Sequence, residues 1–142
     1  MLTLQAAETI VNTALGRARE MNLKPLAVVA LDVRGALRVA KVEDGASLKR
    51  AEIAIGKAHG ALALGMGSRA IHHRVEQQPY FIAAVSHVVG GSLIPVPGGV
   101  LVRDPAGTLV GAIGVSGDSS DNDETVAVAG IVAAGLTAET GG

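Results

Sequence analysis

The stretch LAVVALDVRGALRVAKV, residues 26–42, contains two apolar runs separated by a short polar break. The first run covers residues 26–33 and the second covers residues 37–42, with Arg34, Gly35 and Ala36 between them. Apolar, β-branched runs of this length that are bounded by turn residues predict strands. Strands joined by a tight turn pair antiparallel, because a parallel neighbour requires a long crossover connection. The stretch therefore predicts a β-hairpin.

Helices are predicted on both sides of this hairpin. Before it, apolar residues repeat every three or four positions over residues 3–22, which is the pattern of an amphipathic helix. After it, an alanine-rich segment predicts a long helix over residues 47–66, and a shorter helix follows over residues 68–78 with Ser68 as its N-cap. The shorter helix ends before Pro79, because proline disfavours helix in the residue that precedes it.

The C-terminal half predicts three further strands and a last helix. Residues 79–92 fit more than one kind of element. Residues 92–104 carry a Pro-Gly-Gly turn between two apolar arms, and residues 108–117 form a third apolar run after a second turn. Residues 119–139 open with N-cap residues and acids, which suit the positive end of a helix dipole, so they predict the last helix.

This order of elements predicts an α+β fold in which helices pack on a five-stranded, largely antiparallel sheet. The 142 residues form one domain, because the length suits a single core and no repeat or linker divides the chain. Hydrophobic residues make up 49% of the chain, 19 residues are glycine, and the mean hydropathy is +0.41. That is more apolar surface than one small domain buries, so we expect a homo-oligomer.

Composition also excludes several classes of function. The chain has 12 basic and 13 acidic residues without a run of like charge, and few aromatics, so we expect no nucleic-acid partner. It has no cysteine, which excludes disulfides, thiolate metal sites and a cysteine nucleophile. No membrane span and no signal peptide are predicted, because the apolar stretches are too short and the N-terminus lacks a basic start. We therefore expect a cytoplasmic protein.

Two glycine-rich motifs are candidates for ligand contact. The motif PVPGGV lets the chain adopt positive φ and lets a ligand or another backbone come close. The motif GAIGVSG lies between a strand and a helix start, where free backbone N–H groups bind anions. It is not a dinucleotide fingerprint, because the required βαβ unit is missing. The simpler alternative is that the motifs form only a turn and a helix cap. The candidate ligand-binding residues are Pro97, Gly98, Gly99, Gly114, Val115, Ser116 and Gly117.

Four charged residues are further candidates for a site. Lys57 lies in an otherwise apolar predicted helix, where it would either be desolvated as a base, Schiff-base nucleophile or carboxylate anchor, or reach the surface. Arg69 begins the next predicted helix, and its guanidinium can hold a carboxylate with two parallel hydrogen bonds. Asp123 and Glu124 lie at the start of the last helix, where they stabilise the helix dipole or pair with Lys57 or Arg69.

Four blocks of this sequence together resemble the GlcG/HbpS family: the hairpin, residues 57–69, residues 95–100 and residues 111–124. They occur in the family's order over nearly the whole chain. Members also resemble the C-terminal domain of some corrinoid adenosyltransferases. The resemblance implies a profilin-like or GAF-like α-β-α layered fold, oligomeric assembly and binding of a small molecule such as haem. It also aligns Asp123 and Glu124 with an acidic pair of the family, which raises a catalytic or ligand-orienting role for both.

The four histidines are the remaining candidates. His87 lies between an apolar run and the Pro-Gly-Gly turn, so it is our first choice for a pocket residue. His72 and His73 are adjacent and diverge by about 100° on a helix, so they cannot hold one ion as an i, i+4 pair does. We predict no metal-ion site. Any histidine can be an axial haem ligand, although most histidines face solvent or are satisfied in a core, and the scarcity of aromatics counts against a haem pocket.

Two functional hypotheses follow, beside a purely structural assembly role. The first is an oligomer that binds haem, another tetrapyrrole or a related small molecule. The second is a small cofactor-independent enzyme of the isomerase, tautomerase or decarboxylase type, acting on a carboxylate or an aromatic catabolite. In it Lys57 or His87 moves a proton, while Arg69 and the amides of residues 114–117 hold the anion. In both cases the expected partner is an anionic small molecule.

Overall fold

The predicted hairpin is present in the computed structural model, which describes all 142 residues. Strand β1 (Ala27–Asp32) pairs antiparallel with strand β2 (Leu37–Val42). Gly35 in the connecting turn has a φ of 84°, a conformation that glycine adopts without a Cβ clash. The Asp32 carboxylate accepts hydrogen bonds from the backbone N–H groups of Arg34 and Ala36, and these bonds close the turn.

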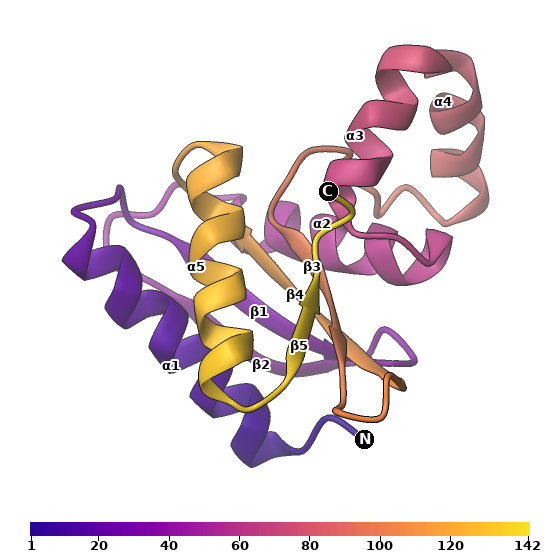
Figure 1. Cartoon of the computed structure of the whole chain (residues 1–142). Coiled ribbons are helices and arrows are strands. Elements are labelled where there is room, and N and C mark those ends of the chain that lie inside the picture. The colour runs from indigo at the N-terminus through magenta and orange to yellow at the C-terminus, as the bar shows by residue number, and fades with distance from the viewer.

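The sheet contains five strands in the order β2-β1-β4-β3-β5 (Figure 1). Strand β4 (Leu109–Ser116) pairs with β1 on one side and with β3 (Gly99–Arg103) on the other. Strand β5 (Thr137–Glu139) adds to the outer edge of β3. Every pairing is antiparallel, which confirms the predicted sheet and the α+β fold class.

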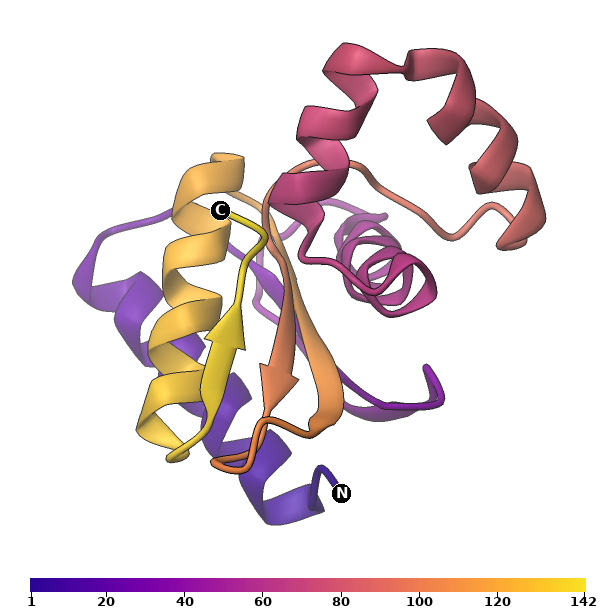
Figure 2. The same cartoon turned by 45° about the vertical axis from the view of Figure 1, so that its right-hand side comes forward.

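Helices cover both faces of this sheet, so the α-β-α layering is also confirmed (Figures 1 and 2). Helices α1 (Leu4–Glu20) and α5 (Ser120–Ala133) pack on one face, and α2 (Arg50–Leu64) packs on the other. The core under α1 and α5 contains many branched side chains. The core under α2 is rich in alanine, so the helix backbone approaches the strands closely. The α2 residues buried in it are Ala54, Ala58 and Ala61.

Helices α3 (Ser68–Gln77) and α4 (Pro79–Val88) project from the layered body, and we call them the arm (Figure 2). The arm includes most of the segment that fitted more than one kind of element, with Pro79 at the first helical position. The sequence of α4, PYFIAAVSHV, is mostly apolar, yet only Ile82 among its residues is buried. The arm therefore presents apolar side chains that the rest of the chain leaves uncovered.

Two predicted element positions are wrong. The apolar segment before the Pro-Gly-Gly turn, residues 92–96, was predicted as a strand and is not one. Pro95 has no N–H for a strand ladder, and the Ile94 N–H donates to the Gly56 carbonyl oxygen of α2 at 3.2 Å. The fifth strand is β5 instead, which lies within the segment predicted as the last helix. Gly135, with a φ of 76°, follows the end of α5 and lets the chain turn back to the sheet.

One predicted helix cap is also wrong. Gly67 occupies the N-cap position of α3, and no side chain caps that helix. The Ser68 hydroxyl instead accepts a hydrogen bond at 2.7 Å from the Gly99 N–H of β3. The turn between α2 and α3 is thereby tied to the start of a strand.

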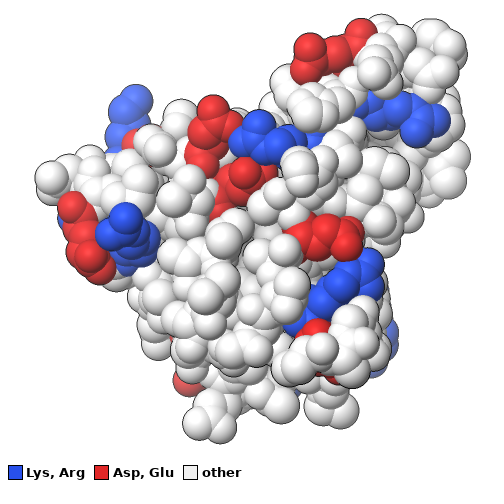
Figure 3. Space-filling model, viewed as in Figure 1, with Lys and Arg blue, Asp and Glu red and all other residues white.

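Many of the charged side chains on the face shown in Figure 3 lie in small clusters in which both signs occur together, separated by uncharged surface. No large area of one sign is present on this face. None of the five helices combines the length and the apolar character that a membrane span requires.

Candidate functional site

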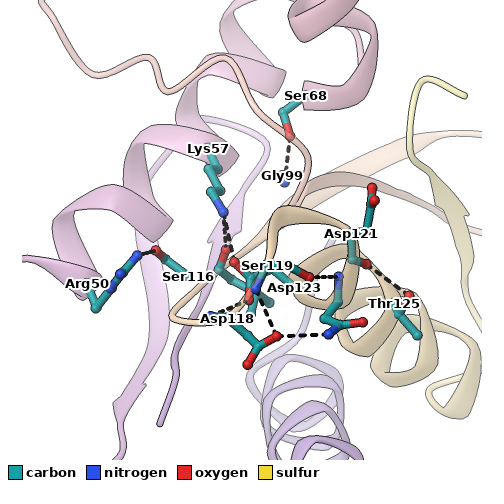
Figure 4. A network of polar contacts seen from close by, with 12 residues as sticks. Arg50, Lys57, Ser68, Gly99, Ser116, Asp118, Ser119, Asp121, Asp123 and Thr125 are labelled. Carbon is teal, nitrogen blue, oxygen red and sulfur yellow. Dashed lines mark hydrogen bonds and ion pairs between the residues drawn. The ribbon is translucent and has the colours of Figure 1, made fainter. Parts of the chain in front are cut away.

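Lys57 and Asp123 form a buried ion pair that joins α2 to the start of α5 (Figure 4). The Lys57 Nζ lies 3.1 Å from Asp123 Oδ2 and donates a second hydrogen bond to the Val115 carbonyl oxygen at 2.9 Å. The two side chains are only 3% and 1% exposed. Lys57 is therefore not a surface lysine, and its charge is neutralised inside the protein.

Burial acts on the protonation of both partners. It lowers the pKa of Lys57 and raises the pKa of Asp123, because removal from water disfavours the charged form of each, while the partner's charge opposes the shift. The Asp118 N–H donates to Asp123 Oδ1 at 3.0 Å, so both carboxylate oxygens have a donor. No buried side-chain nitrogen or oxygen in the structure lacks a partner. The ion pair is thus part of a closed network.

The glycines of both motifs lie against the backbone and side chains of their own chain. A Cβ at Gly98 would lie 2.8 Å from the Val115 carbonyl oxygen and 2.9 Å from Lys57 Nζ. A Cβ at Gly99 or Gly114 would overlap backbone atoms of α2, which are those of Lys57 and Ala54. These glycines allow α2 to pack directly on β3 and β4. Their predicted role in ligand binding stays a prediction.

The Val115 N–H and the Ser116 hydroxyl of these motifs have partners within the chain. The Val115 N–H donates to the Gly98 carbonyl oxygen at 2.9 Å. The Ser116 hydroxyl accepts from the Arg50 guanidinium at 3.0 Å (Figure 4). Gly117 has a φ of 151° and packs against residues 25–26. The N–H of the next residue, Asp118, donates to the chain's own Asp123 carboxylate.

Asp118 holds the turn before α5 in place. Its carboxylate accepts from the Asn122 side-chain amide and from the backbone N–H groups of Ser119 and Lys24, at 2.8–2.9 Å. These hydrogen bonds, first the one from Asn122, lower the pKa of Asp118 to about 2. Ser119 is the N-cap of α5, and its side chain accepts from the Asn122 N–H at 3.2 Å.

Arg69 pairs with two carboxylates at the same end of α5. Its Nε lies 3.1 Å from Glu124 Oε2, and its Nη2 pairs with Asp121. These hydrogen bonds raise the pKa of the Arg69 guanidinium. Of the pairings that the sequence left open, the structure has Lys57 with Asp123 and Arg69 with Glu124.

Arg69 and Pro97 also line a hollow of about 380 Å³ between the arm and the start of α5. Polar side chains dominate its wall. In addition to Arg69 and Pro97, the lining residues are His72, His73, Glu76, Val96, Ser119, Ser120 and Asp121.

A second hollow of about 470 Å³ lies between α2 and residues 90–94. Its wall has an apolar part, and Lys49 and Glu52 supply charge. The remaining lining residues are Ile53, Ile55, Gly56, Gly90, Gly91, Ser92 and Ile94. His87 is exposed at the end of α4 and lines a shallow neighbouring hollow that shares Gly90 and Gly91. The structure therefore brings His87 to this apolar side of the molecule and not to Lys57 or Asp123.

The sequence did not identify Ser68, Arg50 and Asp118 as members of the polar network. Only local signals exist for them: Ser68 precedes Arg69, and Asp118 precedes two serines at a helix start. Their partners, Gly99, Ser116 and Lys24, are far away in the chain. No group of three or more histidine, aspartate or glutamate side chains could hold a metal ion.

Known structures with this fold come from several proteins. A structure of PduOC in complex with heme is 25% identical, covers 99% of each chain and has a TM-score of 0.84. The protein ORFY of Klebsiella pneumoniae is 25% identical over 94% of this chain and 90% of its own, with a TM-score of 0.83. HbpS is 28% identical over 92% of this chain and 88% of its own, with a TM-score of 0.78.

No match is found among curated proteins. A family model described as haem degrading protein HbpS-like matches residues 2–132, which is nearly the whole chain. The blocks that carried the resemblance all lie within the matched residues. The chain therefore belongs to the HbpS-like family.

Proposed function

We propose that this protein binds haem or a closely related tetrapyrrole. The observation that carries the proposal is the similarity over the whole chain to PduOC, whose structure was determined with heme bound. The family model, described as haem degrading and HbpS-like, points to the same ligand. The protein's part in this function would be to bind and orient the macrocycle, while haem iron supplies redox chemistry when bound.

The donor set of this chain fits such a ligand. A haem site needs an apolar wall for the macrocycle, a cation for the propionates and a nitrogen donor for the iron. The hollow beside α2 offers isoleucine side chains and Lys49. One imidazole lies near it: that of His59, which contacts Ser92.

The enzyme hypothesis finds no comparable support. Lys57 and Asp123 are committed to each other in a closed network, and none of the hollows described above is lined by either residue. None of the similar structures is named as an isomerase, a tautomerase or a decarboxylase. We therefore do not propose proton transfer by Lys57.

A haemin titration of the purified apo-protein, followed by absorbance, tests the proposal. Specific binding gives a Soret band that shifts and saturates at a fixed ratio of haemin to protein. A response that rises without saturation, or that matches haemin in buffer, would overturn it. Protoporphyrin IX without iron is the matched ligand, because it measures how much of the affinity comes from the macrocycle alone.

We also propose that the apolar outer side of α4 packs against a second copy of this chain. Tyr80 is 72% exposed and Val88 is 83% exposed, on a mostly apolar helix with only Ile82 buried, and exposed apolar patches mark interfaces. The molar mass from light scattering should exceed that of one chain and fall in the double variant Tyr80→Glu/Val88→Glu. Val132→Glu on α5, another exposed apolar site, is the control and should leave the mass unchanged. A wild-type protein with the mass of one chain would contradict this proposal.

A further inference from the structure

His59 of α2 is held in one tautomer by a backbone carbonyl. Its Nδ1 lies 2.8 Å from the carbonyl oxygen of Ser92, in the segment that returns from the arm to the body. A carbonyl oxygen only accepts hydrogen bonds, so Nδ1 carries the hydrogen in the neutral imidazole. The lone pair that can bind a metal is therefore on Nε2.

The Nε2 of His59 is not fully buried. It makes no hydrogen bond in the structure, and the side chain as a whole is partly buried. No buried side-chain nitrogen lacks a partner, so an Nε2 without a partner must be accessible. His72 provides the contrast: its Nδ1 also faces a carbonyl, that of Pro95, but its Nε2 is engaged by Glu76 at 3.2 Å.

The other two histidines lack this arrangement. Neither His73 nor His87 makes a side-chain hydrogen bond that would fix its tautomer or its ring orientation. Histidines that bind metals commonly donate their second ring N–H to a carbonyl or carboxylate, which orients the ring and makes the ligating nitrogen more basic. Among the four histidines, only His59 combines that support with a free Nε2.

The surroundings of His59 suit a flat, acidic ligand. The Cδ2 atom, which neighbours Nε2 in the ring, faces the turn between β1 and β2, because a Cβ at Gly35 would lie 3.4 Å from it. On either side of Gly35, Val33 and Leu37 are more than half exposed. Arg34 in the same turn keeps most of its guanidinium in solvent while it pairs with Asp32. Two apolar side chains and a cation thus belong to the turn that the ring faces.

We infer that the Nε2 of His59 is an axial ligand of the iron when haem is bound, with the macrocycle against the turn between β1 and β2. This inference rests on the proposed haem binding. It adds the residue that binds the iron, and it places the macrocycle on the turn side of His59 and not in the hollow lined by Lys49. The Ser92 carbonyl would orient the ring, and Arg34 would face a propionate. His87, which the sequence favoured as a pocket residue, would not bind the iron.

Haemin titrations of four proteins test the assignment: the wild type, His59→Ala, His59→Gln and His87→Ala. Glutamine can still donate a hydrogen bond to the Ser92 carbonyl, but it lacks the imidazole. Both His59 variants should bind haemin at least about tenfold more weakly than the wild type and lose its Soret and visible band positions. His87→Ala should match the wild type. Added imidazole should restore the wild-type bands to His59→Ala, because it can enter the space that the side chain left.

The outcomes distinguish the assignment of His59 as the iron ligand from the proposed haem binding. Saturable binding by the wild type with unchanged bands in both His59 variants would overturn the ligand assignment and leave haem binding intact. Loss of the bands in His87→Ala alone would overturn it too. No saturable binding by the wild type would overturn both. Thermal unfolding of the apo-proteins checks that the His59 variants remain folded, so that a lost band reports the ligand.

Discussion

The network around Lys57 and the surface around His59 lie on the same helix but differ in every property that matters for binding. Lys57 and Asp123 are buried, paired and enclosed by glycine-bearing backbone. His59 is partly buried, supported on one nitrogen and free on the other. The residues that dominate the sequence motifs thus hold α2, β4 and α5 together. His59, whose Nε2 has a free lone pair, lies two positions from Lys57, so helical geometry turns its side chain in another direction.

The largest loss of unfolding free energy is expected from removing one partner of the Lys57–Asp123 ion pair. Asp123→Ala leaves the Lys57 ammonium buried without a counter-charge and removes the acceptor for the Asp118 N–H. Removal of one partner of a buried pair typically costs about 3–5 kcal/mol of unfolding free energy. Urea denaturation followed by circular dichroism measures it.

Asp121→Ala is the matched control for this variant, because Asp121 is 78% exposed and its pair with Arg69 is accessible to water. An exposed pair contributes about 0–1 kcal/mol. Equal losses of unfolding free energy in Asp121→Ala and Asp123→Ala would show that the buried ion pair contributes no more to stability than the exposed one.

A smaller effect is expected where α2 meets the sheet. Gly114→Ala places a methyl group on the backbone of Ala54, so α2 must move away from β4. Overpacking of this kind typically costs about 1–3 kcal/mol, and thermal unfolding would show it as a lower melting temperature.

Gly16→Ala is the control for the glycine change. No atom lies within 4 Å of the added methyl group, and the site is exposed within α1. An exposed helical glycine replaced by alanine typically gains about 0.5–1 kcal/mol. If both variants moved the melting temperature in the same direction, close packing on α2 would not explain the glycine at position 114.

The smallest loss of stability is expected from a substitution of Asp118, and this loss depends on pH. The pKa of Asp118 is lowered to about 2 from 3.8, so its ionised form stabilises the folded state above pH ~4. That stabilisation is lost as the pH falls from ~4 towards ~2, where the carboxyl also protonates in the folded protein. Asp118→Asn should therefore be less stable than the wild type at pH 6, with the difference shrinking on acidification. Chemical denaturation at several pH values measures it, and a difference independent of pH would contradict the assignment.

Most of the fold could be predicted because its signals are local. The hairpin is encoded by two apolar runs and a short turn with Gly35, and every strand pair proved antiparallel. Strand β5 could not be predicted, since three residues carry no periodicity and their pairing with β3 depends on a distant segment. Residues 92–96 were wrongly predicted as a strand, because an apolar run beside prolines resembles one. Packing on α2 decided the conformation of this segment instead.

The sequence alone determined the fold class, the family and a small set of chemically reactive residues, because these depend on pattern and residue type. Tertiary structure decided which of those residues are available. The partner of Lys57 lies 66 positions away and the carbonyl that fixes His59 lies 33 positions away. Whether a charge is neutralised or a nitrogen is free depends on such distant neighbours, and a linear pattern does not encode them.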